Sequence, residues 1–95
     1  MIAREFIHSP GRIYALGPDG ALLAEVTFPA SGGVADIDHT FVDPSLRGQN
    51  LAGQLLEAAA AQIRAEGLKA LPTCPYAVRW FSKHPEQADL RHTAP

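Results

Sequence analysis

The chain has only one cysteine, Cys74, among its 95 residues, which excludes an intrachain disulfide and leaves the thiol as either buried filler or a reactive group. Positive charge is not in excess: the formal net charge is -2, so nucleic acid is not an expected partner. No apolar run reaches the roughly 20 residues that cross a bilayer, and residues 1–5 lack the apolar core of a signal peptide. These absences favour a cytoplasmic protein that contacts no membrane.

Metal ligands and nucleotide motifs are also missing. A single cysteine cannot build a thiolate cluster, and the four histidines are dispersed along the chain at His8, His39, His84 and His92. The sequence has no Gly-x-x-x-x-Gly-Lys-Ser/Thr motif, which would cradle a nucleoside triphosphate. We therefore expect neither a bound metal nor a P-loop.

The composition does support one small folded domain over residues 1–95. Apolar residues make up 46% of the chain and charged residues 19%, a balance typical of a globular protein and not of a disordered one. A chain of this length can bury a core large enough to fold alone, but it has little room for a second domain.

The first half of the chain predicts strands. Residues 12–16 form a short apolar run, residues 17–20 are a Gly-Pro-Asp-Gly turn, and residues 21–28 form the second arm of a hairpin. A third strand is predicted over residues 34–42. Its alternation places one set of side chains on a distinctly apolar face, and this set is Ala35, Ile37, His39 and Phe41.

The second half predicts two helices around a last strand. A helix begins near Leu51, carries apolar residues at helical spacing, and ends at Gly67 in a left-handed cap. Residues 68–74 then predict a strand that is parallel to the third, because a helical crossover joins them. Pro75 favours the start of a second helix, which we expect to end near His84.

The loop at residues 43–52 is the most informative segment. It lies between the third strand and the first helix, so it presents backbone N–H groups at a helix start. Such a start carries about half a positive charge and several unpaired donors, which suit a phosphate or pyrophosphate. Taken alone, the segment also fits an ordinary turn between a strand and a helix.

The loop and its surroundings resemble the small single-domain branch of the GNAT (N-acetyltransferase) family. The pyrophosphate loop of that family follows the pattern Gln/Arg-x-x-Gly-x-Gly/Ala, and Arg47 and Ala52 fit its first and last positions. Asn50 stands where the family usually has glycine, although asparagine is the next most tolerant of unusual backbone angles. The motifs Cys74-Pro75-Tyr76, His84-Pro85-Glu86 and His39-Thr40 extend the resemblance over most of the chain.

The resemblance implies an α/β (α+β) fold: a truncated GNAT-like mixed sheet with an N-terminal antiparallel hairpin, a crossover helix and a C-terminal helix. It also implies an enzyme that uses acetyl-CoA, or a related acyl-CoA, and an amine acceptor. The pantetheine arm would lie where the third and last strands splay apart. The cofactor-binding residues it suggests are Phe41, Val42, Arg47, Gly48, Gln49, Asn50, Leu51, Ala52 and Tyr76. No motif identifies the acceptor or the oligomeric state.

This chain departs from the family pattern at the catalytic acid. Many GNAT enzymes use a tyrosine of the second helix as the acid, but here that helix has Trp80 and Phe81 in its body. Cys74 is the alternative, because a helix start lowers a thiol pKa. If the strands are in register, His39 could face Cys74, deprotonate it and let the thiolate attack the thioester.

Other interpretations of the same residues stay open. Cys74 fits buried filler as well as a nucleophile, and His39 fits a core histidine. Arg79 and Lys83 fit a solvated helix face, with contact to the CoA phosphates as the alternative. The loss of the tyrosine also fits a non-catalytic CoA-binding or interaction module.

Overall fold

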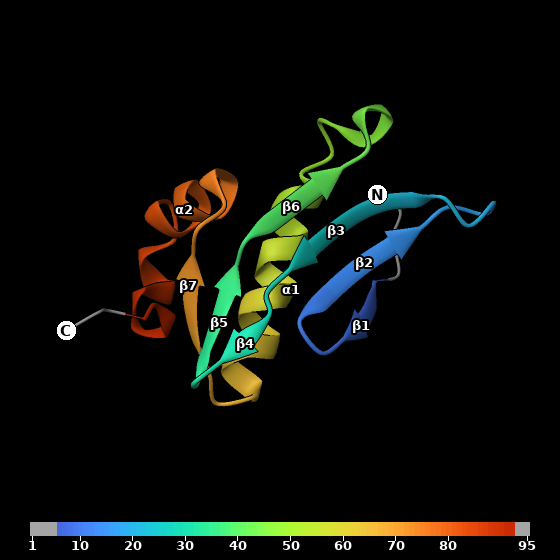
Figure 1. Cartoon of the computed structure of the whole chain (residues 1–95). Helices are drawn as coiled ribbons and strands as arrows, with labels where there is room; N and C mark the ends of the chain where they lie inside the picture. Colours follow the sequence, from blue (N-terminus) through green and yellow to red (C-terminus); the bar gives the residue numbers. More distant parts are fainter. Residues whose placement is uncertain (1–5, 93–95) are drawn as a thin grey trace.

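The computed structural model describes residues 6–92 and contains two helices and seven strands within that range (Figure 1). The strands are β1 (Ile7–Ser9), β2 (Arg12–Leu16), β3 (Leu22–Thr27), β4 (Ala30–Ser31), β5 (Val34–Ile37), β6 (His39–Val42) and β7 (Lys69–Pro72). The helices are α1 (Leu51–Ala65) and α2 (Pro75–Ser82), with 3-10 turns η1 (Pro44–Leu46) and η2 (Pro85–Leu90). Residues 1–5, on which the argument against a signal peptide rests, lie outside the described range.

The strands form two sheets that share one stretch of chain. The antiparallel sheet has the order β1-β2-β3-β6, and the smaller sheet has the order β4-β5-β7 with β5 and β7 parallel. Strands β5 and β6 are successive parts of one extended segment, so this segment joins the two sheets (Figure 1). The predicted hairpin, the crossover helix and the parallel pairing are confirmed, and so is the mixed α+β fold class.

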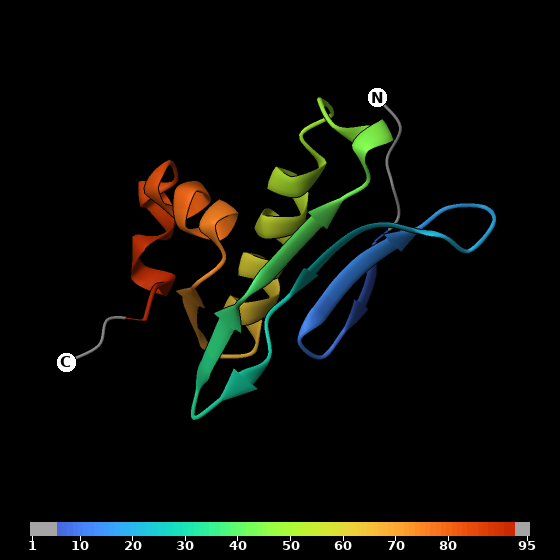
Figure 2. The same ribbon diagram turned by 45° about the horizontal axis from the view of Figure 1, so that its top comes forward.

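Helix α1 covers one face of the sheets and supplies much of the core. Leu55, Leu56 and Ile63 of the helix are fully buried, together with Val26 of β3 and Ile37 of β5. Burying each such side chain contributes about 1.5–3 kcal/mol relative to exposure. Figure 2 shows α1 lying along this face, and no helix of residues 6–92 covers the opposite face of β2 and β3.

The helix ends follow the local chemistry of the sequence. Gly67 adopts φ +73° just after α1, as its predicted role in a left-handed cap requires. Pro75 is the first residue of α2, where its missing N–H costs no helical hydrogen bond. Within residues 6–92, neither helix is long and apolar enough to span a bilayer.

The predicted third strand is interrupted at Asp38, which belongs to neither β5 nor β6. The N–H of Asp38 donates to the carbonyl of Thr27 at 3.3 Å, and Thr27 is also the residue paired with His39. Two residues of this segment therefore oppose one residue of β3, as in a β-bulge. A bulge of one residue reverses the face to which each later side chain points.

The bulge makes the predicted apolar face wrong beyond Asp38. Ala35 and Ile37 are fully buried as expected. After the bulge, however, Thr40 lies directly opposite the buried Val26, so Thr40 and not His39 points toward the face that α1 covers. His39 and Phe41 consequently point to the uncovered face.

Candidate functional site

The loop between β6 and α1 is held at its start by Asp43. The carboxylate of Asp43 accepts hydrogen bonds from the N–H (3.0 Å) and the hydroxyl of Ser45, and these bonds lower the pKa of Asp43. The loop then turns through two positive φ angles, +92° at Gly48 and +55° at Asn50. Asn50 is the only non-glycine residue within 6–92 with a positive φ. Asparagine tolerates this left-handed backbone conformation better than most other residues, so it can stand where the family usually has glycine.

The loop leaves a row of backbone donors without protein partners. Gln54 is the first residue of α1 whose N–H makes the helical hydrogen bond, to the carbonyl of Asn50 at 3.1 Å. Among the described residues, no N–H from Gly48 to Gly53 donates to a protein acceptor. Asn50 is the N-cap residue, but its side chain makes no cap hydrogen bond. The N-terminal end of α1 can therefore bind an anion through these amides.

Gly53 explains how the side chain of Asn50 fits over this helix end. A Cβ at position 53 would come within 3.1 Å of Cγ and 3.2 Å of Nδ2 of Asn50. The side chain of Asn50 thus rests against the first turn of α1, in space that only glycine leaves open. This contact places an amide group beside the unpaired N–H groups.

A hollow of about 310 Å³ opens beside the loop. Seven of the nine predicted cofactor-binding residues line it, together with Thr40 and Leu46: Val42, Arg47, Gly48, Asn50, Leu51, Ala52 and Tyr76. Gln49 and Phe41 do not line it. Phe41 pairs with Glu25 of β3. The N–H of Asp43 donates to the carbonyl of Leu23 at 2.7 Å. Because every second residue of an antiparallel strand directs its backbone groups to the same neighbour, the N–H of Phe41 also points toward β3 and not into the hollow.

The sheet splits next to this hollow. The carbonyl of Ile37 accepts hydrogen bonds from the N–H groups of Thr73 (3.1 Å) and Cys74 (3.0 Å). These are the last backbone hydrogen bonds between the end of β5 and the segment that follows β7. Beyond this point β6 pairs only with β3, so the N–H groups of Thr40 and Val42 point away from β3 toward the gap. The predicted splay between the third and last strands is thus present in the backbone.

Cys74 lies at this split, as the N-cap residue of α2. Its half-buried Sγ contacts Oγ1 of Thr40 at 3.6 Å. Burial raises the pKa of the Cys74 thiol, but hydrogen bonds from the N–H of Ala77, the hydroxyl and N–H of Thr40, and the N–H of Tyr76 outweigh burial, so the pKa is lowered. These donors favour the thiolate, the nucleophilic form of cysteine.

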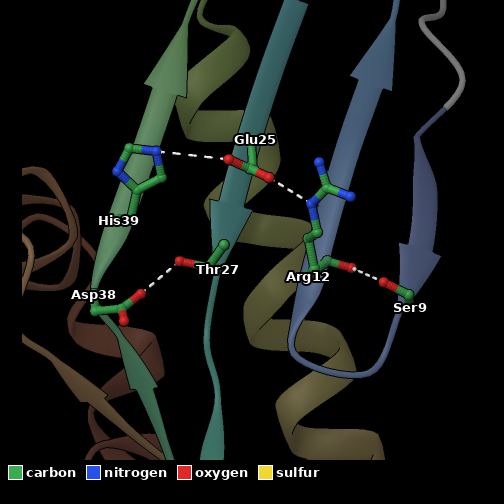
Figure 3. Close-up of polar contacts among 6 residues, drawn as sticks. All are labelled: Ser9, Arg12, Glu25, Thr27, Asp38 and His39. Atoms are coloured by element: carbon green, nitrogen blue, oxygen red, sulfur yellow. Dashed lines mark hydrogen bonds and ion pairs between the residues drawn. The ribbon is translucent and has the colours of Figure 1, made fainter. Parts of the chain in front are cut away.

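His39 lies on the other face of the sheet and does not face Cys74. Figure 3 shows its ring directed at Glu25, with the ribbon of α1 behind the strands, and the Nε2 to Oε1 distance is 3.6 Å. Glu25 is also paired with Arg12, whose guanidinium lies 3.8 Å from the centre of the Tyr14 ring. The predicted relay from His39 to Cys74 is therefore wrong in its geometry. The core alternative is wrong as well, because the side chain of His39 is 54% exposed.

Thr40 is the residue that sequence reasoning missed. It contacts the thiol and also lines the hollow, so it joins the two parts of the site. The alternation of residues 34–42 predicts Thr40 on the face opposite Ala35, Ile37 and His39, which is the face away from the predicted apolar one. No residue type in this segment marks the bulge, so the sequence offered no signal for it.

No group of three or more metal-ligating side chains occurs within residues 6–92. The site brings together the unpaired amides of the loop and the thiol of Cys74. The amides of the loop can hold an anion in the hollow, and the thiol of Cys74 contacts Thr40, which also lines the hollow.

The family model described as GCN5-related N-acetyl-transferase matches residues 13–90. No curated protein matches the sequence. Among solved structures, the chain is similar to a GCN5-like candidate N-acetyltransferase from Staphylococcus aureus, with 26% identity and a TM-score of 0.78, over 100% of this chain and 94% of that chain.

Two structures of lower identity show the same fold. One is the ribosomal-protein-S18-alanine N-acetyltransferase from Escherichia coli, at 16% identity and TM-score 0.62, over 82% of this chain and 50% of that chain. The other is N-acetylglutamate synthase from Neisseria gonorrhoeae in complex with coenzyme A and N-acetyl-glutamate, at 16% identity and TM-score 0.63, over 78% and 18%. The chain therefore belongs to the GCN5-related N-acetyltransferase (GNAT) family of enzymes, which transfer an acyl group from acyl-CoA.

Proposed function

We propose that this enzyme transfers an acetyl group from acetyl-CoA to an amine, and that Cys74 carries the acetyl group as a thioester between the two steps. The observation that supports this proposal is the position of Thr40. Its side chain contacts Sγ of Cys74 at 3.6 Å and lines the hollow that also reaches the unpaired amides of the loop. A ligand held by the amides can thus extend to Thr40, whose side chain contacts the thiol.

The coenzyme is held in two places in this proposal. Its diphosphate binds the N–H groups between Gly48 and Gly53, where the N-terminal end of α1 adds favourable electrostatics. Its pantetheine arm runs along the open edge of β6 and takes a hydrogen bond from the backbone N–H of Val42. The thioester then lies beside Cys74.

The first chemical step forms the acyl-enzyme. Cys74 reacts as a thiolate, and the N–H groups at the start of α2 favour that state. Sγ attacks the thioester carbonyl, the new C–S bond forms, and the bond to the CoA sulfur breaks. Cys74 loses its proton to solvent before the attack. The departing CoA thiolate takes a proton from solvent afterwards, so the step consumes no net proton.

The second step transfers the acetyl group to the acceptor. A neutral amine nitrogen attacks the carbonyl carbon, the C–N bond forms, and the bond to Sγ of Cys74 breaks. The extra proton on nitrogen passes through water to Cys74 or to solvent. This route needs no acid in the body of α2, where the chain has the buried Trp80 and Phe81.

Intact mass spectrometry tests the proposal. The wild-type protein mixed with acetyl-CoA should gain the mass of one acetyl group, peptide mapping should place it on Cys74, and Cys74→Ala should gain none. Unfolded wild-type protein controls for direct reaction of a thiol with the thioester, and its labelling should be much slower. Calorimetry should show that Cys74→Ala still binds acetyl-CoA.

The outcomes separate binding from chemistry. Binding without an adduct, together with amine acetylation that survives in Cys74→Ala, would exclude the acyl-enzyme and leave direct transfer. Binding with no acetylation of any amine in a panel of polyamines, amino acids and lysine peptides would favour the non-catalytic module. Absence of binding would exclude the coenzyme site itself.

A further inference from the structure

The segment that carries the thiol has few backbone donors. It reads Pro72-Thr73-Cys74-Pro75, and neither proline has an N–H group. The N–H groups of Thr73 (3.1 Å) and Cys74 (3.0 Å) both donate to one carbonyl, that of Ile37. These two hydrogen bonds therefore attach the segment to β5 through a single oxygen atom. One attachment point does not fix how the segment is rotated about its own axis.

A side-chain hydrogen bond supplies a second attachment point. Oγ1 of Thr73 donates to Oδ1 of Asp36 at 2.5 Å, a length typical of a hydroxyl bound to a carboxylate. The carbonyl oxygen of Ile37 lies farther from the same hydroxyl, at 3.4 Å. Because a threonine hydroxyl has only one hydrogen to donate, the bond to Asp36 is the stronger of these two contacts.

This bond lies on the face of the sheet that α1 does not cover. Asp36 alternates along β5 with fully buried residues, so its carboxylate points to the uncovered face. Cys74 follows Thr73 directly, and its Sγ contacts Oγ1 of Thr40, which points to the covered face. Two successive residues are thus held on opposite faces of the sheet, Thr73 by the carboxylate and Cys74 by the hydroxyl of Thr40.

We infer, on the basis of the proposed function, that Asp36 and Thr73 are positioning residues that hold Sγ of Cys74 in place for the attack on the thioester. Neither side chain touches the thioester. Without their hydrogen bond the segment keeps its attachment to Ile37, but the thiol is free to turn away from the hydroxyl of Thr40. Misplacing a reacting atom by about 1 Å can slow a reaction about 100-fold.

A second bond of the same chemistry offers a matched comparison. Oγ1 of Thr27 donates to the carboxylate of Asp38, and Figure 3 shows this bond on the uncovered face. Its loss should not move Thr40, because β6 is paired with β3 along its whole length. The bond of Thr73 should therefore affect the thiol, whereas the bond of Thr27 should affect only stability.

Two measurements test the positioning role. The pH dependence of alkylation by iodoacetamide reports the pKa of Cys74 without any coenzyme, and intact mass spectrometry after rapid quenching reports the rate of acetyl transfer to Cys74. Thr73→Val should raise this pKa and slow acetyl transfer about tenfold or more at saturating acetyl-CoA, with an unchanged Kd by calorimetry. Asp36→Ala should act in the same way. Thr73→Ser and Asp36→Asn should restore both quantities, because they keep the donor and the acceptor.

Thr27→Val is the matched control, and urea unfolding should show a loss of stability similar to that of Thr73→Val. Its thiol pKa and its rate of acetyl transfer should equal those of the wild type. A wild-type pKa and rate in Thr73→Val would overturn the inference and leave the proposed function intact, and so would an equal change in Thr27→Val or a failure of Thr73→Ser to restore them. If the wild type gains no acetyl group, the proposed function is wrong, whereas a raised thiol pKa in Thr73→Val alone would still support the positioning of Cys74.

Discussion

Replacing Asn50 by glycine tests how much the side chain of Asn50 limits the anion site. Asn50 has φ +55°, and its side chain packs over Gly53 without making a cap hydrogen bond. The substitution Asn50→Gly clears this side chain from the first turn of α1 and removes no backbone donor. We expect it to tighten the binding of acetyl-CoA.

The magnitude follows from the donors that the side chain crowds. If clearing it lets the diphosphate reach one more N–H, such as that of Gly53, the gain is about 1.5 kcal/mol for a hydrogen bond to a charged group, or roughly tenfold in Kd. Stability should change little. Relief of the left-handed backbone gives about 1 kcal/mol, and the greater entropy that glycine loses on folding costs about 0.5–1 kcal/mol.

Calorimetry with acetyl-CoA and thermal unfolding measure the two quantities. Gln49→Gly is the matched control, because it adds the same flexibility one residue earlier in the loop and Gln49 does not line the hollow. It should bind no more tightly than the wild type. Weaker binding by Asn50→Gly would refute the reasoning, since it would mean that the amide of Asn50 itself holds the anion.

Three further predictions concern the thiol and the helix end. Thr40→Val should raise the pKa of Cys74 by removing its hydroxyl donor, whereas His39→Ala should leave it unchanged, as read from the pH dependence of alkylation by iodoacetamide. Because the folded pKa of Cys74 is lowered, the thiolate stabilises the fold above the unfolded thiol pKa, about 8.5, and this contribution is lost as the pH falls through the folded value. The pH dependence of urea unfolding in this window should disappear in Cys74→Ser. Gly67→Ala should destabilise the protein by about 1 kcal/mol in the same assay, because Gly67 has φ +73°.

The sequence predicted the elements that have strong local signals. Residues 12–16 form β2 with the predicted bounds, and α1 begins at the predicted Leu51. Pro75 marks the start of α2, and the parallel pairing of β5 with β7 follows from the crossover between them. Each of these depends on periodicity, on a residue with restricted backbone angles, or on a connection rule, all of which act over a few neighbouring residues.

The sequence could not predict where the side chains of the third strand point. A bulge at Asp38 depends on how two strands meet, and the residues of one strand alone do not specify that meeting. Its consequence extends to every later residue, so His39 is exchanged for Thr40 as the neighbour of Cys74. Strand β1 was missed for a related reason: its three residues are too few to show alternation.

The break at Asp38 also accounts for why the site lies where it does. Before it the segment pairs with β7, and after it the segment pairs only with β3, so the chain can leave β7 and begin α2 with Cys74 beside the open edge of β6. The same reversal turns the hydroxyl of Thr40 toward the thiol and leaves its N–H facing the gap. After the break, Thr40 faces the nucleophile at an open edge, and His39 lies on the face that α1 does not cover. A variant that lacks Asp38 should keep Thr40 beside Cys74 and His39 on the uncovered face, because regular alternation from the buried Ile37 then gives the same two directions.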